Sequence, residues 1–124
     1  MPLPPKSEVI AKVMENKVQT RHPQLDIDKP IYTLGVASEM LEAHPRTLMV
    51  YEHLNMVRPQ RTTTNRRRYS PRDVMKLRAI QKLTRKHGVN LAGARFILTL
   101  LKDIYNAGIA PPGRFKDVDV SLLN

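Results

Sequence analysis

The dipeptide His44-Pro45 constrains the fold most, because it divides a stretch of helical apolar spacing into two short segments. The residue before a proline avoids the α region, and proline suits the first turn of a helix. A first helix is therefore expected to end before His44, and a second to begin at Pro45. The apolar residues of the first helix form one face, namely Val36, Ala37, Met40 and Leu41. Thr33 is its expected N-cap, and two short helices joined in this way outline a helix-turn-helix.

The second helix is expected to run from Pro45 to about Leu54. Its inward face is predicted to hold Leu48 and Tyr51, with Leu54 as a further candidate. Its outward face then holds Arg46, Thr47, Val50 and His53. Asn55 follows where the chain must turn, since asparagine tolerates the left-handed conformation that often ends a helix.

A β-hairpin wing is predicted after this turn. Residues 56–59 (Met-Val-Arg-Pro) indicate a short strand, residues 67–69 indicate a returning strand, and residues 62–65 form the loop between them. The run RTTTNRRRY, residues 61–69, therefore lies in the wing. Its adjacent arginines repel one another and have no acidic neighbour within the run, which favours a negatively charged partner.

Two further helices are predicted after the wing. Ser70 and Asp73 can form a capping box for the first, with Pro71 in its first turn. Asn90 can cap the second, which ends by Gly108. The first helix is expected to bury a stripe made of Val74, Leu77, Ile80 and Leu83. One side of the second is expected to hold its apolar residues, namely Leu91, Ala94, Ile97, Leu98, Leu101, Ile104 and Tyr105. The expected fold is mainly α: a winged helix-turn-helix with a two-stranded wing and two following helices.

Segments on either side of this domain, residues 31–108, are assigned as an N-terminal arm, residues 1–30, and a C-terminal tail, residues 109–124. Apolar residues recur at helical spacing from Val9 to Val18, which fits either a helix packed on its own domain or a dimer contact. In the tail, alternating apolar residues indicate a short strand: Val118, Val120 and Leu122.

Positive charge is concentrated in one segment of the chain. The 124 residues carry a net charge of +10, whereas residues 58–95 alone hold twelve basic residues and a single acid, Asp73. The remainder of the chain is therefore close to neutral. A basic segment of this kind favours a polyanion-binding face, and a solvated basic surface is the alternative.

Several classes of protein are disfavoured by what the sequence lacks. It has no cysteine, and its four histidines lack ligand spacing, so neither a metal nor another cofactor is expected. No apolar run approaches the roughly 20 residues that span a membrane, and no signal peptide is recognised, which suits a cytoplasmic protein. Neither paired carboxylates nor a nucleophile–base set stands out, so an enzyme is not expected.

Several motifs are specific in combination: Tyr32-Thr33 before the first helix, RTL at 46–48, YE at 51–52, RRYS at 67–70 and GVNLAGARFIL at 88–98. With these motifs, residues 31–101 resemble the DNA-binding domain of MerR-type bacterial transcription regulators. The HPRTL and NLAG segments look most like the heat-shock-repressor branch, and the wing is also similar to that of the glutamine-synthetase regulators. The resemblance implies a dimer that binds double-stranded DNA in the bacterial nucleoid.

Two departures from the family pattern bear on the mechanism. Family members usually carry an arginine where this chain has Met49, so one contact is expected to be missing or replaced by apolar contact with a thymine methyl. The usual family dimer uses a long C-terminal coiled coil, but only 16 residues follow Gly108 and two of them are consecutive prolines. A homodimer without that coiled coil is expected, through the N-terminal arm or the helix from Asn90 to Ala107.

The predicted DNA-binding residues are Thr33, Arg46, Thr47, Val50, His53, Arg61, Thr64, Asn65, Arg66, Arg67 and Arg68. The first turn of a recognition helix meets base edges, so Arg46 and Thr47 are expected to select the sequence. The wing arginines are expected to contact phosphates or to enter the minor groove, which supplies affinity and register. Glu52 is expected to pair with an arginine, because phosphates would repel a free carboxylate.

The predicted function is that of a sequence-specific DNA-binding transcription regulator, a repressor of a stress or chaperone operon. By resemblance, the chaperone DnaK and RNA polymerase are candidate protein partners. Two alternatives stay open: an excisionase-like accessory protein that bends DNA, and a chaperone-binding adaptor that acts through the apolar tail. Promoter occupancy separates the regulator from the excisionase, and a pulldown with the chain truncated after Ile109 tests the adaptor.

Overall fold

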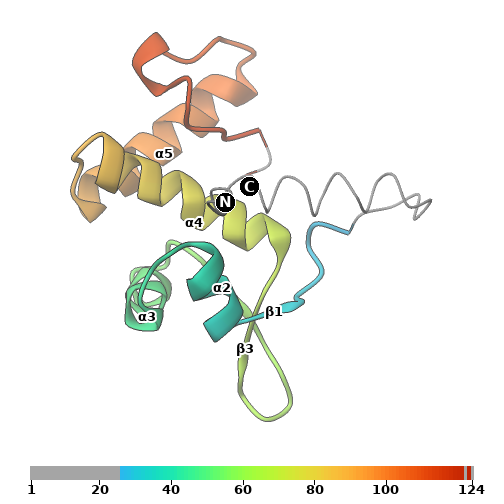
Figure 1. Cartoon of the computed structure of the whole chain (residues 1–124). Coiled ribbons are helices and arrows are strands. Elements are labelled where there is room, and N and C mark those ends of the chain that lie inside the picture. Colours follow the sequence, from blue (N-terminus) through green and yellow to red (C-terminus); the bar gives the residue numbers. More distant parts are fainter. Residues whose placement is uncertain (1–25, 122, 124) are drawn as a thin grey trace, which may run out of the picture. The chain divides into compact units, whose positions relative to one another are not determined.

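The computed structural model describes residues 26–121 and Leu123 (Figure 1). The helix predicted between Val9 and Val18 lies outside these residues. The chain divides between Val74 and Met75 into two compact units, and each is described by itself. The domain boundaries expected at residues 30 and 108 stay predictions.

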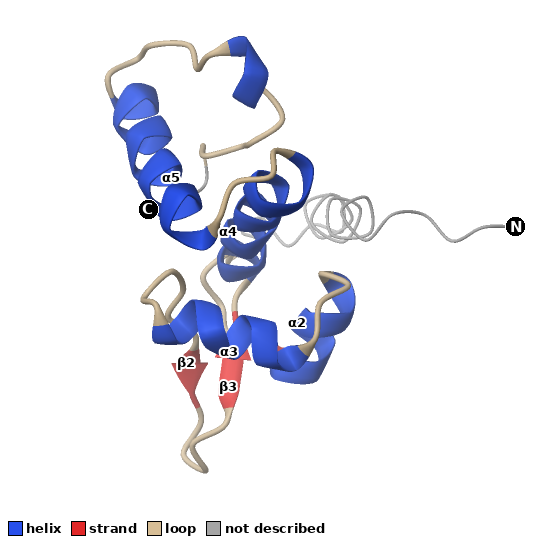
Figure 2. Cartoon of the chain, turned by 90° about the vertical axis from the view of Figure 1, so that its left-hand side faces the viewer, coloured by secondary structure: helices blue, strands red, loops and turns tan. Residues whose placement is uncertain are grey.

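The first unit contains the predicted helix-turn-helix and wing. Its elements are β1 (Tyr32–Thr33), α2 (Leu34–Met40), α3 (Pro45–His53), β2 (Gln60–Arg61) and β3 (Arg67–Tyr69). The three strands form an antiparallel sheet in the order β1-β3-β2. The hairpin of β2 and β3 extends below α3 in Figure 2. The mainly helical winged helix-turn-helix is thus confirmed, with one strand more than predicted.

The two helices begin at side-chain caps. The backbone N–H of Val36 donates to Oγ1 of Thr33 at 3.1 Å, which confirms the cap predicted for α2. At α3, proline takes the first turn as predicted, and Nδ1 of His44 accepts from the N–H of Arg46 at 3.0 Å. Only the start of α3 was predicted, since histidine is not among the residues that usually cap helices.

The inward faces of α2 and α3 agree in part with the predicted ones. Leu48 and Tyr51 of α3 are buried as predicted. Ala37 in α2 and Leu41, which follows the last residue of α2, are also buried as predicted. The inward placement of two residues was wrong, since Val36 is 45% exposed and Leu54 is 36% exposed.

In α2, Ser38 lies on the inward face, where Val36 was predicted to lie. Ser38 is buried, and its hydroxyl donates to the carbonyl oxygen of Leu34 at 2.7 Å. Because that bond satisfies the hydroxyl locally, a polar side chain can occupy the inward face and Val36 turns outward.

The first wing strand lies later in the chain than predicted. Residues 56–59 were predicted as the strand, but the pairing begins at Gln60, opposite Arg68. Met56 and Val57 are buried, so their apolar character serves packing rather than strand alternation. Asn55 has a φ of 59°, which confirms the predicted turn.

The third strand, β1, was not predicted. It pairs Tyr32 with Tyr69 and Thr33 with Arg68. An element of two residues is too short for an alternating pattern to show in the sequence.

The helix α4 (Pro71–Gln81) begins at the predicted capping box. The N–H of Ser70 donates to Oδ2 of Asp73 at 3.0 Å, and the N–H of Asp73 donates to Oγ of Ser70 at 3.0 Å. The predicted stripe is fully buried: Val74, Leu77, Ile80 and Leu83. The helix continues into a π-helical turn, η1 (Lys82–Lys86), which no sequence signal indicated.

The second unit ends in α5 (Leu91–Asn106) and a 3-10 turn, η2 (Gly113–Phe115). Asn90 caps α5 as predicted, since its Oδ1 accepts from the N–H of Gly93 at 2.8 Å. Buried residues of α5 are Ala94, Leu98 and Leu101. Tyr105, on the predicted apolar side of this helix, is 50% exposed.

The strand predicted in the tail was wrong as far as the tail is described. Val118 and Val120 are buried, but they lie in turns closed by short-range backbone bonds, such as Val118 N–H to the carbonyl oxygen of Phe115 at 2.9 Å. The burial of both valines thus explains their alternating spacing without a strand.

Candidate nucleic-acid interface

The outward surface of α3 is one continuous stripe. Its exposed residues are Arg46, Met49, Val50 and His53. They follow the spacing i, i+3, i+4, i+7, which places them on one side of the helix. Leu48 and Tyr51 are buried on the opposite side and hold the helix in place. Of the predicted outward residues, Thr47 is only half-exposed.

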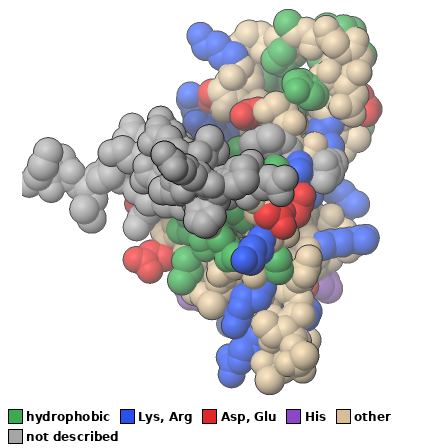
Figure 3. Space-filling view, turned by 90° about the vertical axis from the view of Figure 1, so that its right-hand side faces the viewer, with side chains coloured by type: hydrophobic (Ala, Val, Ile, Leu, Met, Phe, Trp, Pro, Cys, Tyr) green, Lys and Arg blue, Asp and Glu red, His purple; other side chains and the backbone are tan. Residues whose placement is uncertain are grey.

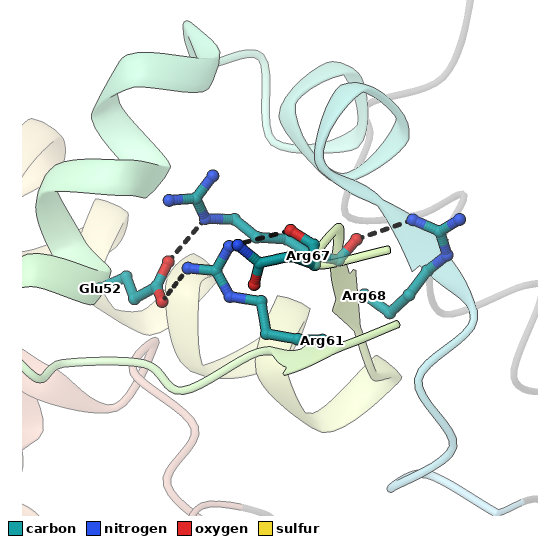
Figure 4. Close-up of polar contacts among 5 residues, drawn as sticks. Glu52, Arg61, Arg67 and Arg68 are labelled. Carbon is teal, nitrogen blue, oxygen red and sulfur yellow. Dashed lines mark hydrogen bonds and ion pairs between the residues drawn. The ribbon is translucent and has the colours of Figure 1, made fainter. Parts of the chain in front are cut away.

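Glu52 connects α3 to both strands of the wing. Its Oε1 accepts from Nε of Arg67 at 2.6 Å, and its Oε2 accepts from Nη2 of Arg61 at 2.9 Å (Figure 4). The two arginines are directly opposite each other on β2 and β3. One carboxylate therefore separates two cross-strand cations that would otherwise repel each other. The predicted pairing of Glu52 with an arginine is confirmed.

This contact also sets the ionisation of the carboxylate. Partial burial raises the pKa of Glu52, but the hydrogen bonds and charges of Arg67 and Arg61 outweigh that effect. The net result is a pKa below the ordinary value for a glutamate. The carboxylate therefore stays charged at neutral pH, and the wing stays joined to α3.

The other face of the wing carries Arg68, which points away from Glu52 in Figure 4. Its Nη1 donates to the carbonyl oxygen of Arg67 at 2.9 Å, which holds the guanidinium end of the side chain against the backbone of β3. Thr33 of β1 is its cross-strand neighbour. An open pocket of about 480 Å³ lies here, lined by Thr33, Leu34, Gly35, Asn65, Arg66, Arg67 and Arg68. Hydroxyl and guanidinium groups at one opening suit a phosphate oxygen.

The wing tip is held by its own hydrogen bonds. The N–H of Arg66 donates to Oγ1 of Thr62 at 3.1 Å, and that oxygen lies 3.0 Å from Oγ1 of Thr64. Asn65 adopts a φ of 62°, a turn conformation that asparagine tolerates. The tip therefore presents four consecutive exposed polar residues, from Thr63 to Arg66, on a closed loop.

The wing carries several basic side chains. Figure 3 shows Lys and Arg side chains along the lower part of the molecule, where the hairpin lies in Figure 1. Tyr69, at the base of the wing, is fully buried, and burial raises its pKa to about 12, so its hydroxyl adds no charge there. The surface offered by the wing is thus polar and cationic.

The structure brings most of the predicted residues to the helix stripe or to the wing. It leaves Arg61 and Arg67 bound to Glu52, so these two differ from Arg66, whose side chain makes no hydrogen bond or ion pair within residues 26–121. Met49, which stands where family members usually carry an arginine, is 40% exposed on the same side of the helix as Arg46. DNA contact by any of them stays a prediction.

Other kinds of site find no support in the part of the chain that the structure describes. In residues 26–121, no three His, Asp or Glu side chains come close enough together to hold a metal ion. Within the same range, no helix has both the length and the apolar character needed to span a bilayer.

Comparisons with known proteins agree with this geometry. The family model described as MerR HTH family regulatory protein matches residues 32–101. A protein of Streptomyces coelicolor, described as a candidate heat shock protein HspR, is 43% identical over 77 residues, which are 62% of this chain and 51% of that protein. The HTH-type transcriptional regulators GlnR of Bacillus anthracis and Bacillus cereus are each 35% identical over 94 residues, 76% of this chain and 71% of each relative. The chain thus spans about half the length of the HspR protein.

Proposed function

The chain belongs to the MerR HTH family of regulatory proteins, and we propose that it regulates transcription by binding a specific sequence of double-stranded DNA. The observation that carries the proposal is the exposed stripe of α3 beside a cationic wing that Glu52 ties to the same helix. An α-helix fits the major groove, and a basic wing beside it fits the flanking backbone. Two elements held in one geometry are what sequence-specific docking needs.

The contacts divide into those that choose a sequence and those that supply affinity. Arg46 and Thr47 lie in the first turn of α3, where side chains reach base edges, and an arginine can bind O6 and N7 of guanine together. Arg66 at the wing tip and Arg68 beside the pocket are the proposed phosphate contacts. Arg67 is proposed mainly to position the wing, because its Nε is already bound to Glu52.

The proposed biological role is repression of a stress or chaperone operon. Its support is the similarity to a protein described as a heat shock protein and the resemblance of the HPRTL segment to heat-shock repressors. A homodimer in the cytoplasm is proposed, since regulators of this kind bind paired half-sites. DnaK and RNA polymerase are its proposed protein partners.

Selection from random duplexes tests the proposal directly. The purified full chain should enrich one sequence motif, with two half-sites if it binds as a dimer. About 6–10 phosphate contacts per dimer predict a fall in affinity of about 10³–10⁵ between 50 and 200 mM salt. Absence of an enriched motif together with a flat salt dependence would contradict the proposal.

Chromatin mapping tests the finer role. Occupancy of promoters upstream of chaperone genes, lost after heat shock, is the expected result. Occupancy confined to recombination attachment sites would favour the excisionase-like alternative instead. Occupancy of unrelated promoters would leave a DNA-binding regulator and remove the stress role.

A further inference from the structure

The centre of the α3 stripe is apolar. Met49 is 40% exposed and Val50 is 41% exposed, although both lie on the side of the helix that faces water. The ends of the stripe are polar, with Arg46 one turn before and His53 one turn after. The proposed reading surface therefore has an apolar centre, formed by two adjacent residues, between polar ends.

The chemistry of DNA offers a matching partner. In the major groove, thymine is the base that carries a C5 methyl group, and apolar side chains contact it. A hydrogen-bonding base edge would gain nothing from Met49 or Val50, because neither side chain can donate a hydrogen bond and neither carries a strong acceptor. Burying one methyl against an apolar side chain contributes about 0.8 kcal/mol, a factor of about four in affinity.

We propose that Met49 and Val50 select thymine by contact with its methyl group at the centre of each half-site. This inference rests on the proposed function and names the base that the apolar part of α3 reads. Arg46 then reads a neighbouring base pair by hydrogen bonding, so the two halves of the stripe use different chemistry. The expected ligand is a DNA duplex with thymine at these positions. Uracil differs from thymine only by lacking the methyl group, so a duplex with uracil there should bind more weakly.

The test replaces single thymines by deoxyuridine in the motif obtained by selection. Base pairing and phosphate positions are unchanged, so only the methyl group is removed. The wild-type chain should bind about fourfold more weakly for each thymine that contacts the stripe. Uracil at flanking positions should have no effect.

Protein variants assign the effect to the two side chains. Met49→Gln and Val50→Asn keep the approximate size of each residue and leave no methyl group at these exposed positions, so folding should be retained and is checked by circular dichroism. In the double variant, thymine and uracil duplexes should bind equally. Ile109→Gln is the matched control, because Ile109 is 61% exposed and lies outside both the stripe and the helix from Asn90 to Ala107, and it should keep the full preference for thymine.

The outcomes separate the inference from the proposed function. Equal affinity of the wild-type chain for thymine and uracil duplexes would overturn the inference while leaving specific DNA binding intact. A uracil effect of the same size in the double variant would also overturn it, because other residues would then read the methyl. If no motif is enriched at all, the proposed function fails, and the inference fails with it.

Discussion

Nε of Arg67 donates to Oε1 of Glu52 at 2.6 Å, which joins the wing strand β3 to the C-terminal turn of α3. Arg61 completes the contact from the opposite strand at 2.9 Å. Two of the guanidinium groups predicted to contact DNA are thus bound to a carboxylate. Glu52 links the element proposed to choose a sequence to the element proposed to hold the backbone.

Glu52→Gln should weaken that link. A neutral amide cannot balance two cross-strand guanidinium groups, so the free energy of unfolding should fall by about 1 kcal/mol, allowing for solvent screening. Random DNA should bind more tightly, because two arginines are released, while the ratio of specific to random affinity should fall. Urea titration and gel-shift assays measure the two effects.

A matched control separates geometry from charge. Glu39→Gln changes the net charge equally, and Glu39 is exposed on α2. It should keep both the stability and the specificity of the wild-type chain. An equal loss of specificity in the two variants would show that net charge, rather than the Glu52 contact, explains the effect.

Elements of the fold were predicted correctly where a residue near their start gives a local signal in the sequence. Pro45, Ser70 and Asn90 are local signals for helix starts, and all three helices begin where predicted. The strand β1 was not predicted because its two residues are recognisable as a strand only through their pairing with β3, far along the chain. Val36 was placed inward because spacing alone could not show that Ser38 satisfies its hydroxyl on Leu34.

The candidate site was predictable in composition but not in its internal pairing. Charge counting located the wing and its arginines, and the outward side of α3 followed from its period. Which arginines meet Glu52 depends on strand register, and the predicted first strand ended before Arg61. Sequence separation of 9 and 15 residues between Glu52 and its two partners leaves no local pattern to read.

Arg66→Ala should weaken binding to specific and random DNA alike. The side chain is exposed at the wing tip, where it is proposed to contact phosphate, so its loss should reduce the salt slope by about 1 per subunit. Arg114→Ala, an equal change of charge at an exposed residue of η2, should leave affinity unchanged.

Arg46→Ala should instead lower specific affinity alone, by about tenfold or more. Equal behaviour of Arg66→Ala and Arg46→Ala would contradict the proposed division between wing and helix.

His44→Ala should lower the free energy of unfolding by about 1 kcal/mol, as expected for loss of an N-cap. Nδ1 of His44 accepts from the N–H of Arg46 at 3.0 Å, and alanine offers no acceptor. His44→Asn should retain the stability, because asparagine caps helices well. His53→Ala, at the exposed C-terminal end of the same helix, is the control. If asparagine and alanine destabilise the chain equally, the cap does not explain the effect.

Asp117→Asn should remove a pH-dependent part of the stability of the second unit. The Lys86 ammonium, bound at 2.9 Å, together with the His87 ring at 3.1 Å, lowers the pKa of Asp117 from 3.8 to about 2 despite partial burial. Because the folded pKa is depressed, this stabilisation is complete above pH 3.8 and is lost as the pH falls through about 2. Wild-type and variant stabilities should therefore differ above about pH 4 and converge below pH 2.

Urea titrations across this range measure the difference between wild type and Asp117→Asn. Asp103→Asn is the control, since Asp103 is exposed on α5. Its stability should follow the wild-type curve throughout. A gap between wild type and Asp117→Asn that persists unchanged at pH 2 would mean that packing, rather than the charge of the carboxylate, provides the stabilisation.

Gly93→Ala should destabilise the chain, although alanine is normally the better helix residue. A Cβ atom at position 93 would lie 2.7 Å from Cγ1 of Val89 and 3.2 Å from Oδ1 of Asn90, the oxygen that caps α5. Relief of that contact moves either the cap or the valine, so a loss of about 1–3 kcal/mol is expected. Gly35→Ala in α2 should do the opposite and stabilise by about 0.5–1 kcal/mol, because no atom lies within 4 Å of its added Cβ. Adding Val89→Ala to Gly93→Ala should recover part of the loss, and a double variant no more stable than the single one would show that the crowding is not at Val89.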